Sequence, residues 1–202
     1  MIRERTFAEA LEHRRSYYSI SNDSPVQDEE IVHIIRTAVK YVPSAFNSQT
    51  TRVVLLLGDE HQKLWRIVKD QLEERLSKEQ YRQSEKKIDT SFSCGYGTIL
   101  FFEDRSIVEG LQKQFPTYHE NFPTWSQHTS AMHQLAIWTM LEDKGLGASL
   151  QHYNPLIDED VRSTWHLPET WQLIAQMPFG TPVGEPGGKE FDDLSERIKI
   201  FI

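Results

Sequence analysis

Apolar residues recur at helical spacing in several stretches of the chain. In residues 28–42 the apolar positions fall on one side of a helix, and Pro43 then ends the pattern. The same kind of spacing predicts further helices over residues 7–11, 60–76, 123–144 and 157–165. Residues 78–89 are densely charged, and we expect a solvated helix or a lid there.

Short, continuous apolar runs predict buried strands. Residues 52–58, 98–102 and 171–177 are of this kind, and 148–153 is expected to contain strand and loop. Isoleucines at 198, 200 and 202 alternate with other residues, which favours a terminal strand over 197–202. Helices therefore alternate with four or five strands, a pattern typical of an α/β or α+β domain.

The predicted terminal strand follows a tail rich in proline and glycine, residues 182–188. Such a tail can carry a strand onto a neighbouring subunit. The 123–144 helix is apolar around much of its circumference, which is typical of burial in a core or an interface. Together these features favour an intertwined dimer, although an edge strand on the chain's own sheet fits the pattern equally well.

Length and charge narrow the class of protein. The 202 residues suit a single domain, 1–202, and carry 22 basic and 30 acidic side chains, so the net charge is −8. An acidic chain without basic clusters is expected to bind nucleic acid poorly, because it cannot neutralise the phosphate charges. No apolar run approaches the ~20 residues of a membrane span. Residues 1–12 are charged rather than apolar, so we expect no secretory signal and a cytosolic protein.

Several chemistries have no sequence support. His128 and His133 are five residues apart and diverge on a helix, so a zinc site of the paired-histidine type is not predicted. The Gly-x-Ser-x-Gly, Walker and Gly-x-Gly-x-x-Gly motifs are absent. The single cysteine, Cys94, excludes an intrachain disulfide and is more typical of a small buried side chain than of a reactive thiol.

Four polar segments remain as candidates for ligand binding. Arg14, Arg15 and Ser16 offer two guanidinium groups and a hydroxyl, a good clamp for phosphate. Loop 43–49 is dense in amides and hydroxyls, which can hydrogen-bond the edge of a polar ring. Small residues in 145–155 allow a backbone to approach a flat ligand, and Lys189 adds a positive charge. Each segment also has a commoner explanation, as a helix end, a turn, a helix cap or a surface lysine.

In their order and spacing, these segments resemble the nitroreductase/flavin reductase family over nearly the whole chain. The residues that carry the resemblance are Arg14-Arg15-Ser16, Pro43-Ser44 with Asn47 and Gln49, and Gly145-Leu146-Gly147. The segment 147–155 looks like the branch named for fatty acid repression mutant proteins. The ending with Gly180, Pro182 and Lys189-Glu190-Phe191 points to the same branch.

The resemblance implies an α+β, nitroreductase-like fold with a central, mostly antiparallel sheet flanked by helices. It also implies an intertwined homodimer with exchanged C-terminal strands and one FMN at each of two interface sites. The residues it assigns to the FMN phosphate are Arg14, Arg15, Ser16 and Lys189. Those assigned to the ring edge and ribityl chain, partly from the partner subunit, are Ser44, Asn47 and Gln49, while the backbone of Ser149, Leu150 and Gln151 would lie near flavin N5.

One position departs from the family pattern. Many relatives have a basic residue two positions after the phosphate-binding serine, near flavin N1 and O2, where this chain has Tyr18. A phenol donates a hydrogen bond but brings no positive charge. Flavin reduction should therefore be less favourable unless Arg52 or a lysine of 78–87 compensates. The usual Pro-Trp pair of the family is also replaced, by Thr50-Thr51.

The resemblance implies an FMN-dependent oxidoreductase. A hydride would pass from NAD(P)H to flavin N5 and on to an electron-poor acceptor such as a nitroaromatic or a quinone, with no side chain acting as catalytic acid or base. The alternative is an FMN-binding stress or regulatory protein with little turnover, which would use the same residues and which Tyr18 favours. A flavin-free binder of phosphate ligands is a third reading of the same residues.

Overall fold

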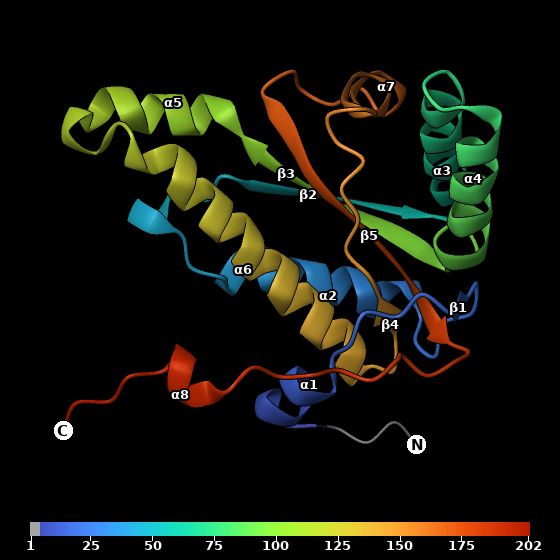
Figure 1. Cartoon of the computed structure of the whole chain (residues 1–202). Coiled ribbons are helices and arrows are strands. Elements are labelled where there is room, and N and C mark those ends of the chain that lie inside the picture. The colour runs from blue at the N-terminus through green and yellow to red at the C-terminus, as the bar shows by residue number, and fades with distance from the viewer. Residues whose placement is uncertain (1–4) are drawn as a thin grey trace.

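The computed structural model describes residues 5–202, so residues 1–4, the start of the charged N-terminal segment, lie outside it. Within the described part, five strands form one antiparallel sheet: β1 (Ile20–Ser21), β2 (Thr51–Leu57), β3 (Gly97–Asp104), β4 (Gly147–Ala148) and β5 (Trp171–Pro182). Their order is β1-β5-β3-β2, and β4 also pairs with β5. Helices cover both faces of the sheet (Figure 1), which confirms the α+β fold class.

Strand β3 lies in the middle of the sheet and is buried on both sides. Every residue from Gly97 to Asp104 is buried. Because side chains alternate along a strand, Ile99 and Phe101 face one layer of helices, whereas Leu100 and Phe102 face the other. The continuous apolar run that predicted this strand therefore reflects a second layer of helices rather than a solvated face.

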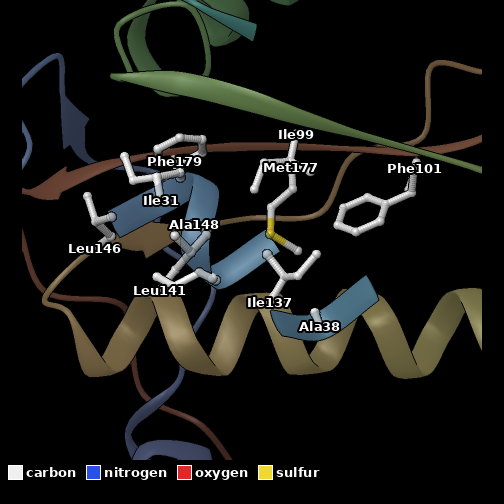
Figure 2. Close-up of a cluster of buried hydrophobic side chains, with 12 residues drawn as sticks. Ile31, Ala38, Ile99, Phe101, Ile137, Leu141, Leu146, Ala148, Met177 and Phe179 are labelled. Atoms are coloured by element: carbon white, nitrogen blue, oxygen red, sulfur yellow. The ribbon is translucent and has the colours of Figure 1, made fainter. Parts of the chain in front are cut away.

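One layer consists of α2 (Asp28–Tyr41) and α6 (Asn121–Asp143). Ile31 and Ala38 of α2 and Ile137 of α6 meet Met177 of β5 in a single cluster (Figure 2). Complete burial of an aliphatic side chain stabilises a protein by ~1.5–3 kcal/mol, so this cluster holds α6 firmly against the sheet. The predicted long, buried helix is confirmed.

The opposite layer consists of α3 (Gly58–Glu73), α4 (Lys78–Ser91) and α7 (Asp158–Thr164). Helix α4 is the charged segment, and within it Ile88 is the fully buried residue. Lys69 of α3 and Asp89 of α4 form an ion pair with Nζ and Oδ1 2.9 Å apart. Segment 78–89 is therefore a solvated helix anchored on α3.

The remaining elements are α1 (Phe7–His13), α5 (Arg105–Gln114), the single-turn α8 (Leu194–Arg197), and the 3-10 turns η1 (Ala45–Asn47) and η2 (Pro116–Tyr118). Helix α5 was not predicted, because it starts directly at the end of β3 with Asp104 as its N-cap. No helix within residues 5–202 has the length and apolar character needed to cross a bilayer.

The terminal strand predicted over 197–202 is not formed within the single chain. Arg197 ends α8, and residues 198–202 pair with no strand of the described part. Figure 1 shows the tail running past α1 and away from the sheet. A strand needs a partner for its backbone groups, and the tail has none within the described part of its own chain. Ile200 and Phe201 are consequently exposed.

Candidate functional site

The arginine segment is fixed beside β4 by backbone contacts. After α1, the chain runs along β4, where the Tyr17 N–H donates to the Ala148 carbonyl at 2.9 Å. Ser16 and Ala148 also form a parallel bridge. Close approach requires a glycine at 147, because a Cβ there would lie 2.9 Å from the Tyr17 side chain. Two of the candidate segments, 14–18 and 147–151, are thus neighbours.

A cavity of about 390 Å³ lies between this segment and the tail that follows β5. Residues 14–19 form one wall and residues 184–189 the other, and the two stretches run side by side below the sheet in Figure 1. A guanidinium nitrogen of Arg15 donates to the Gly187 carbonyl at 2.6 Å, which ties the tail across the cavity. Arg14, Arg15, Ser16 and Lys189, which the family resemblance assigns to one phosphate, all line it.

The cavity is basic and contains an unpaired donor. The Arg14 guanidinium lies over the Trp138 ring, 4.4 Å from its centroid, and its Nε is buried without a hydrogen-bond partner among residues 5–202. Burial, and then the neighbouring Arg15 charge, lowers the pKa of Arg14, while Glu142 opposes the shift. Glu185 also lines the cavity, so three cations face one carboxylate. An incoming anion would both occupy the free donor and offset the like charges.

Tyr18 lines the same cavity and is 46% exposed. Its ring lies 6.2 Å from that of Phe92, and Lys87 Nζ of α4 lies 5.9 Å from the Tyr18 ring centroid. Arg52 instead pairs with Asp104 at the far end of β2, with Nη2 and Oδ2 3.2 Å apart. The sequence offered Arg52 or a lysine of 78–87 as a compensating cation; the structure brings Lys87 to Tyr18, while Arg52 pairs with Asp104.

The backbone at 149–151 presents one free donor. The Ser149 N–H donates to the Pro178 carbonyl at 3.2 Å and the Gln151 N–H to the Gln176 carbonyl at 2.7 Å. The N–H of Leu150, between them, has no partner within the described residues. The side chains of Ser149 and Gln151 bond each other at 3.0 Å and are buried. These two side chains support the segment, and its backbone is the part free to meet a ligand.

Loop 43–49 has an unusual backbone. Phe46, Asn47 and Gln49 have φ angles of 56°, 51° and 49°. These angles lie in the left-handed region, which residues other than Gly and Asn seldom adopt. Ser44 Oγ accepts from the Gln49 N–H at 3.0 Å, so part of the loop's polarity serves its own turn. Asn47 and Gln49 keep exposed side chains. Strained backbone persists where the surroundings enforce it, often at functional sites.

The loop and the arginine cavity lie at opposite ends of α6. Phe46 packs on four rings, including Trp125 of α6 at 5.9 Å between centroids, whereas Arg14 packs on Trp138. Thirteen residues separate the two tryptophans (138 − 125), which corresponds to about 20 Å along a helix. A single chain therefore does not bring Ser44, Asn47 and Gln49 together with Arg14, Arg15 and Ser16.

Comparison with protein-family profiles matches residues 11–181 to the nitroreductase family. The chain belongs to the nitroreductase family. It is 34% identical to HBN1 of Saccharomyces cerevisiae over 198 residues, 97% of each chain, and 32% identical to the nitroreductase FRM2 of the same yeast over 197 residues, 96% of each chain. FRM2 is the fatty acid repression mutant protein, so the resemblance to that branch is confirmed.

A solved nitroreductase has nearly the same fold. CinD from Lactococcus lactis, in complex with chloramphenicol, is 43% identical, with a TM-score of 0.87 over 97% of this chain and 100% of that one. The family match and this structure make the protein an oxidoreductase of nitroreductase type. Members of the family are generally flavin-dependent.

Two residues of this nitroreductase site were missed by sequence reasoning. Trp138 supports Arg14, and Phe46 organises the aromatic cluster below loop 43–49. Both contacts join residues far apart in the sequence, so no local sequence pattern predicts them. The described residues contain no group of three or more His, Cys, Asp or Glu suited to a metal ion. Burial raises the pKa of Cys94, which disfavours the reactive thiolate.

Proposed function

We propose that this nitroreductase-family protein binds FMN and passes a hydride from NAD(P)H to electron-poor acceptors such as nitroaromatics or quinones. The observation that carries the proposal is the basic cavity beside β4, in which Arg14 Nε is buried without a partner. A buried, unpaired donor costs ~1–3 kcal/mol, and a phosphate would remove that cost. Chloramphenicol, the ligand of CinD in its complex, carries a nitroaromatic ring and supports the acceptor class.

Each candidate residue has a role in this proposal. Arg14 and Arg15 would pair with phosphate oxygens, Ser16 would donate its hydroxyl, and Lys189 would add charge from the tail. The free N–H of Leu150 would donate to the ring system. When bound, FMN would supply N5 as hydride acceptor and release the electrons to the second substrate. The chain's own contribution is position and charge, so no side chain is assigned as catalytic acid or base.

The proposal requires a homodimer. Ser44, Asn47 and Gln49 would reach the flavin of the other subunit, because they lie at the far end of α6 from their own chain's cavity. Large apolar side chains are exposed on α1, on α6 and along the tail: Phe7, Leu11, Met132, Leu135, Phe191, Leu194, Ile198, Ile200 and Phe201. A second copy would bury them and would offer the C-terminal segment the strand partner that it lacks here.

Tyr18 supports a second candidate function, that of an FMN-binding regulatory protein with little turnover. An anionic reduced flavin is stabilised by a nearby cation, and the phenol supplies none. Lys87, 5.9 Å from the Tyr18 ring, is the cation that would compensate in the oxidoreductase. The Lys87→Gln variant separates the two functions, since it lowers the flavin midpoint potential if Lys87 acts on the flavin. An unchanged potential would leave Lys87 without that role and favour the regulatory protein.

The test is a visible absorption spectrum of the protein after FMN has been added and free flavin removed, followed by anaerobic addition of NADH or NADPH. Retained flavin bands that bleach promptly are the expected result. Bands that persist would favour the regulatory function, and no retained flavin would overturn the FMN proposal. Light scattering on the same sample gives the oligomeric state, and a flavin-loaded monomer would contradict the proposed shared site.

A further inference from the structure

Two unpaired groups of opposite charge lie near the C-terminal end of α6. Trp138 and Glu142 are four residues apart, so they are neighbours on the surface of the helix. Arg14 lies over the Trp138 ring, and its Nε and the Oε2 of Glu142 are both buried without a hydrogen-bond partner in residues 5–202. Burial and the Arg15 charge lower the pKa of Arg14, and Glu142 opposes the shift. The Glu142 carboxylate therefore acts on the charge of Arg14 without forming an ion pair with it.

Arg5, which precedes α1, occupies this carboxylate. Its Nη1 donates to Glu142 Oε1 at 2.8 Å, and its backbone N–H donates to Asp143 Oδ1 at 2.9 Å. The side chain of Glu142 is 11% exposed and that of Arg5 26%, so the pair is screened less by water and salt than an exposed pair. In Figure 1, α1 lies beside the C-terminal end of α6. Arg5 and Arg14, on the two sides of α1, are thereby both brought to the end of α6 that carries Glu142.

The way in which Arg14 is held leaves its hydrogen-bond donors available. A guanidinium that lies over an aromatic ring is attracted through its face, and its N–H groups stay free. A carboxylate would instead accept from those N–H groups, frequently from two at once. If Arg14 were paired with Glu142, that pair would have to break before a phosphate could bind, and the apparent affinity for the phosphate would fall. Because Glu142 is paired with Arg5, Arg14 does not carry this cost.

We propose that Arg5 is a positioning residue for the phosphate site: by pairing with Glu142, it keeps Arg14 free to bind the phosphate of FMN. The inference rests on the proposed function, in which Arg14 binds that phosphate. Residues 14–19 and 184–189 line the arginine cavity, whereas Arg5 and Glu142 do not. An effect of Arg5 on phosphate binding would therefore pass through Arg14 rather than through a contact with the ligand. The ion pair outside the cavity and the unpaired Nε inside it then have one explanation.

The test measures by fluorescence how tightly the full-length Arg5→Ala protein binds FMN and riboflavin, which has the same ring system but no phosphate. FMN affinity should fall about threefold to tenfold, because Glu142 then pairs with Arg14, and riboflavin affinity should not change. The double variant Arg5→Ala/Glu142→Gln removes the competing carboxylate and should restore the FMN affinity of wild type. Lys144→Ala is the matched control, because it removes a positive charge from the same end of α6, where Lys144 Nζ lies 3.5 Å from Asp143 Oδ2. It should leave both affinities unchanged.

Three results would each overturn the proposal: unchanged FMN affinity in Arg5→Ala, equal losses for FMN and riboflavin, or a double variant that binds FMN as weakly as Arg5→Ala. Wild type that binds neither flavin would instead overturn the proposed function.

A crystal structure of Arg5→Ala without flavin gives an answer that does not depend on FMN binding. The expected result is a carboxylate oxygen of Glu142 within about 4 Å of an Arg14 nitrogen, the distance of an ion pair. A Glu142 side chain that stays apart from Arg14 after Arg5 is removed would overturn the proposal, since Arg5 would then not be what keeps the two groups unpaired.

Discussion

The two faces of β3 bury polar groups in opposite ways. Toward α3, the groups form a closed chain: Trp65 Nε1 donates to Thr98 Oγ1 at 3.0 Å, Thr98 donates to His61 Nδ1 at 2.8 Å, and His61 Nε2 donates to the Ser93 carbonyl at 3.1 Å. This direction of donation is the one that satisfies all four groups. Toward α6, Thr51 Oγ1 donates to Glu103 Oε1 at 2.6 Å, while Glu103 Oε2 and Thr50 Oγ1 are buried without a close hydrogen bond within residues 5–202.

The difference separates a closed hydrogen-bond network from a side of the strand where the bonding is incomplete. His61 and Glu103 are both 1% exposed, so burial alone does not distinguish them. What distinguishes them is whether every donor and acceptor is used. Arg14, supported by α6, repeats the pattern of Glu103, with a buried Nε that lacks a partner. We therefore expect substitutions on the α3 face to change stability and substitution of the unpaired Arg14 to change ligand binding.

The largest expected effect is that of Thr98→Val. The change keeps the side-chain shape but removes the hydroxyl shared by Trp65 and His61, so two buried groups lose their partners. Each such group costs ~1–3 kcal/mol, which predicts a loss of about 2–6 kcal/mol in the free energy of unfolding. Urea unfolding measures it. Thr90→Val, on the exposed face of α4, is the control and should change stability by less than about 0.5 kcal/mol. A Thr98→Val protein as stable as the control would mean that the network is not structural.

Arg14→Ala tests the unpaired group that packs on α6. Loss of a charge-assisted hydrogen bond to phosphate is worth ~1.5–3 kcal/mol, so FMN affinity should fall about tenfold to a hundredfold. Quenching of flavin fluorescence on binding measures the affinity. Arg36→Ala removes an exposed arginine of α2 with no role in the cavity and should leave it unchanged. If both variants bind FMN as wild type does, Arg14 does not bind phosphate.

The pH dependence of stability gives a further test of the network on the α3 side, because His61 is part of it. Burial lowers its pKa to about 4, from 6.5 for an ordinary histidine. The unfolded chain therefore takes up a proton below pH 6.5 that the folded chain does not, and stability falls as the pH drops from 6.5 toward 4. The loss due to His61 should be about 2 kcal/mol at pH 5 relative to pH 7. His61→Gln cannot titrate, so its stability should fall by that much less over this range in urea unfolding at the two pH values. Equal acid sensitivity of both proteins would contradict a neutral, network-bound His61.

The elements that dominate the fold could be predicted because their signals are local. The apolar stripe of α2 and the continuous runs of β2 and β3 are visible within a few residues of sequence. Helix α5 follows β3 without a loop, so no turn residues marked the boundary between the strand and the helix. The terminal strand was predicted from the alternation of residues 198–202 and from the family resemblance, and within one chain it has no partner.

The candidate site could be predicted only in part. Arg14, Arg15, Ser16 and Lys189 were grouped by resemblance, and the structure brings them to one cavity. The support of Arg14 by Trp138, 124 residues later in the sequence (138 − 14), depends on how α1 packs on α6.

The smallest predicted effect concerns the strained loop on the α6 side. Gln49→Gly relieves a left-handed φ of 49° and should raise stability by up to about 1 kcal/mol. The same change removes the amide proposed to meet the flavin ring, so FMN affinity should fall by about threefold to tenfold. Fluorescence titration and urea unfolding on one preparation measure both. His166→Gly, at a φ of 51° away from the site, should gain stability with no change in affinity. If the Gln49→Gly protein is more stable and binds FMN with unchanged affinity, the backbone strain at position 49 has no role in binding. A gain in stability together with a loss of FMN affinity would mean that the loop keeps a costly conformation because binding requires it. The unpaired Nε of Arg14, near the other end of α6, would then be a second group that costs stability and serves binding.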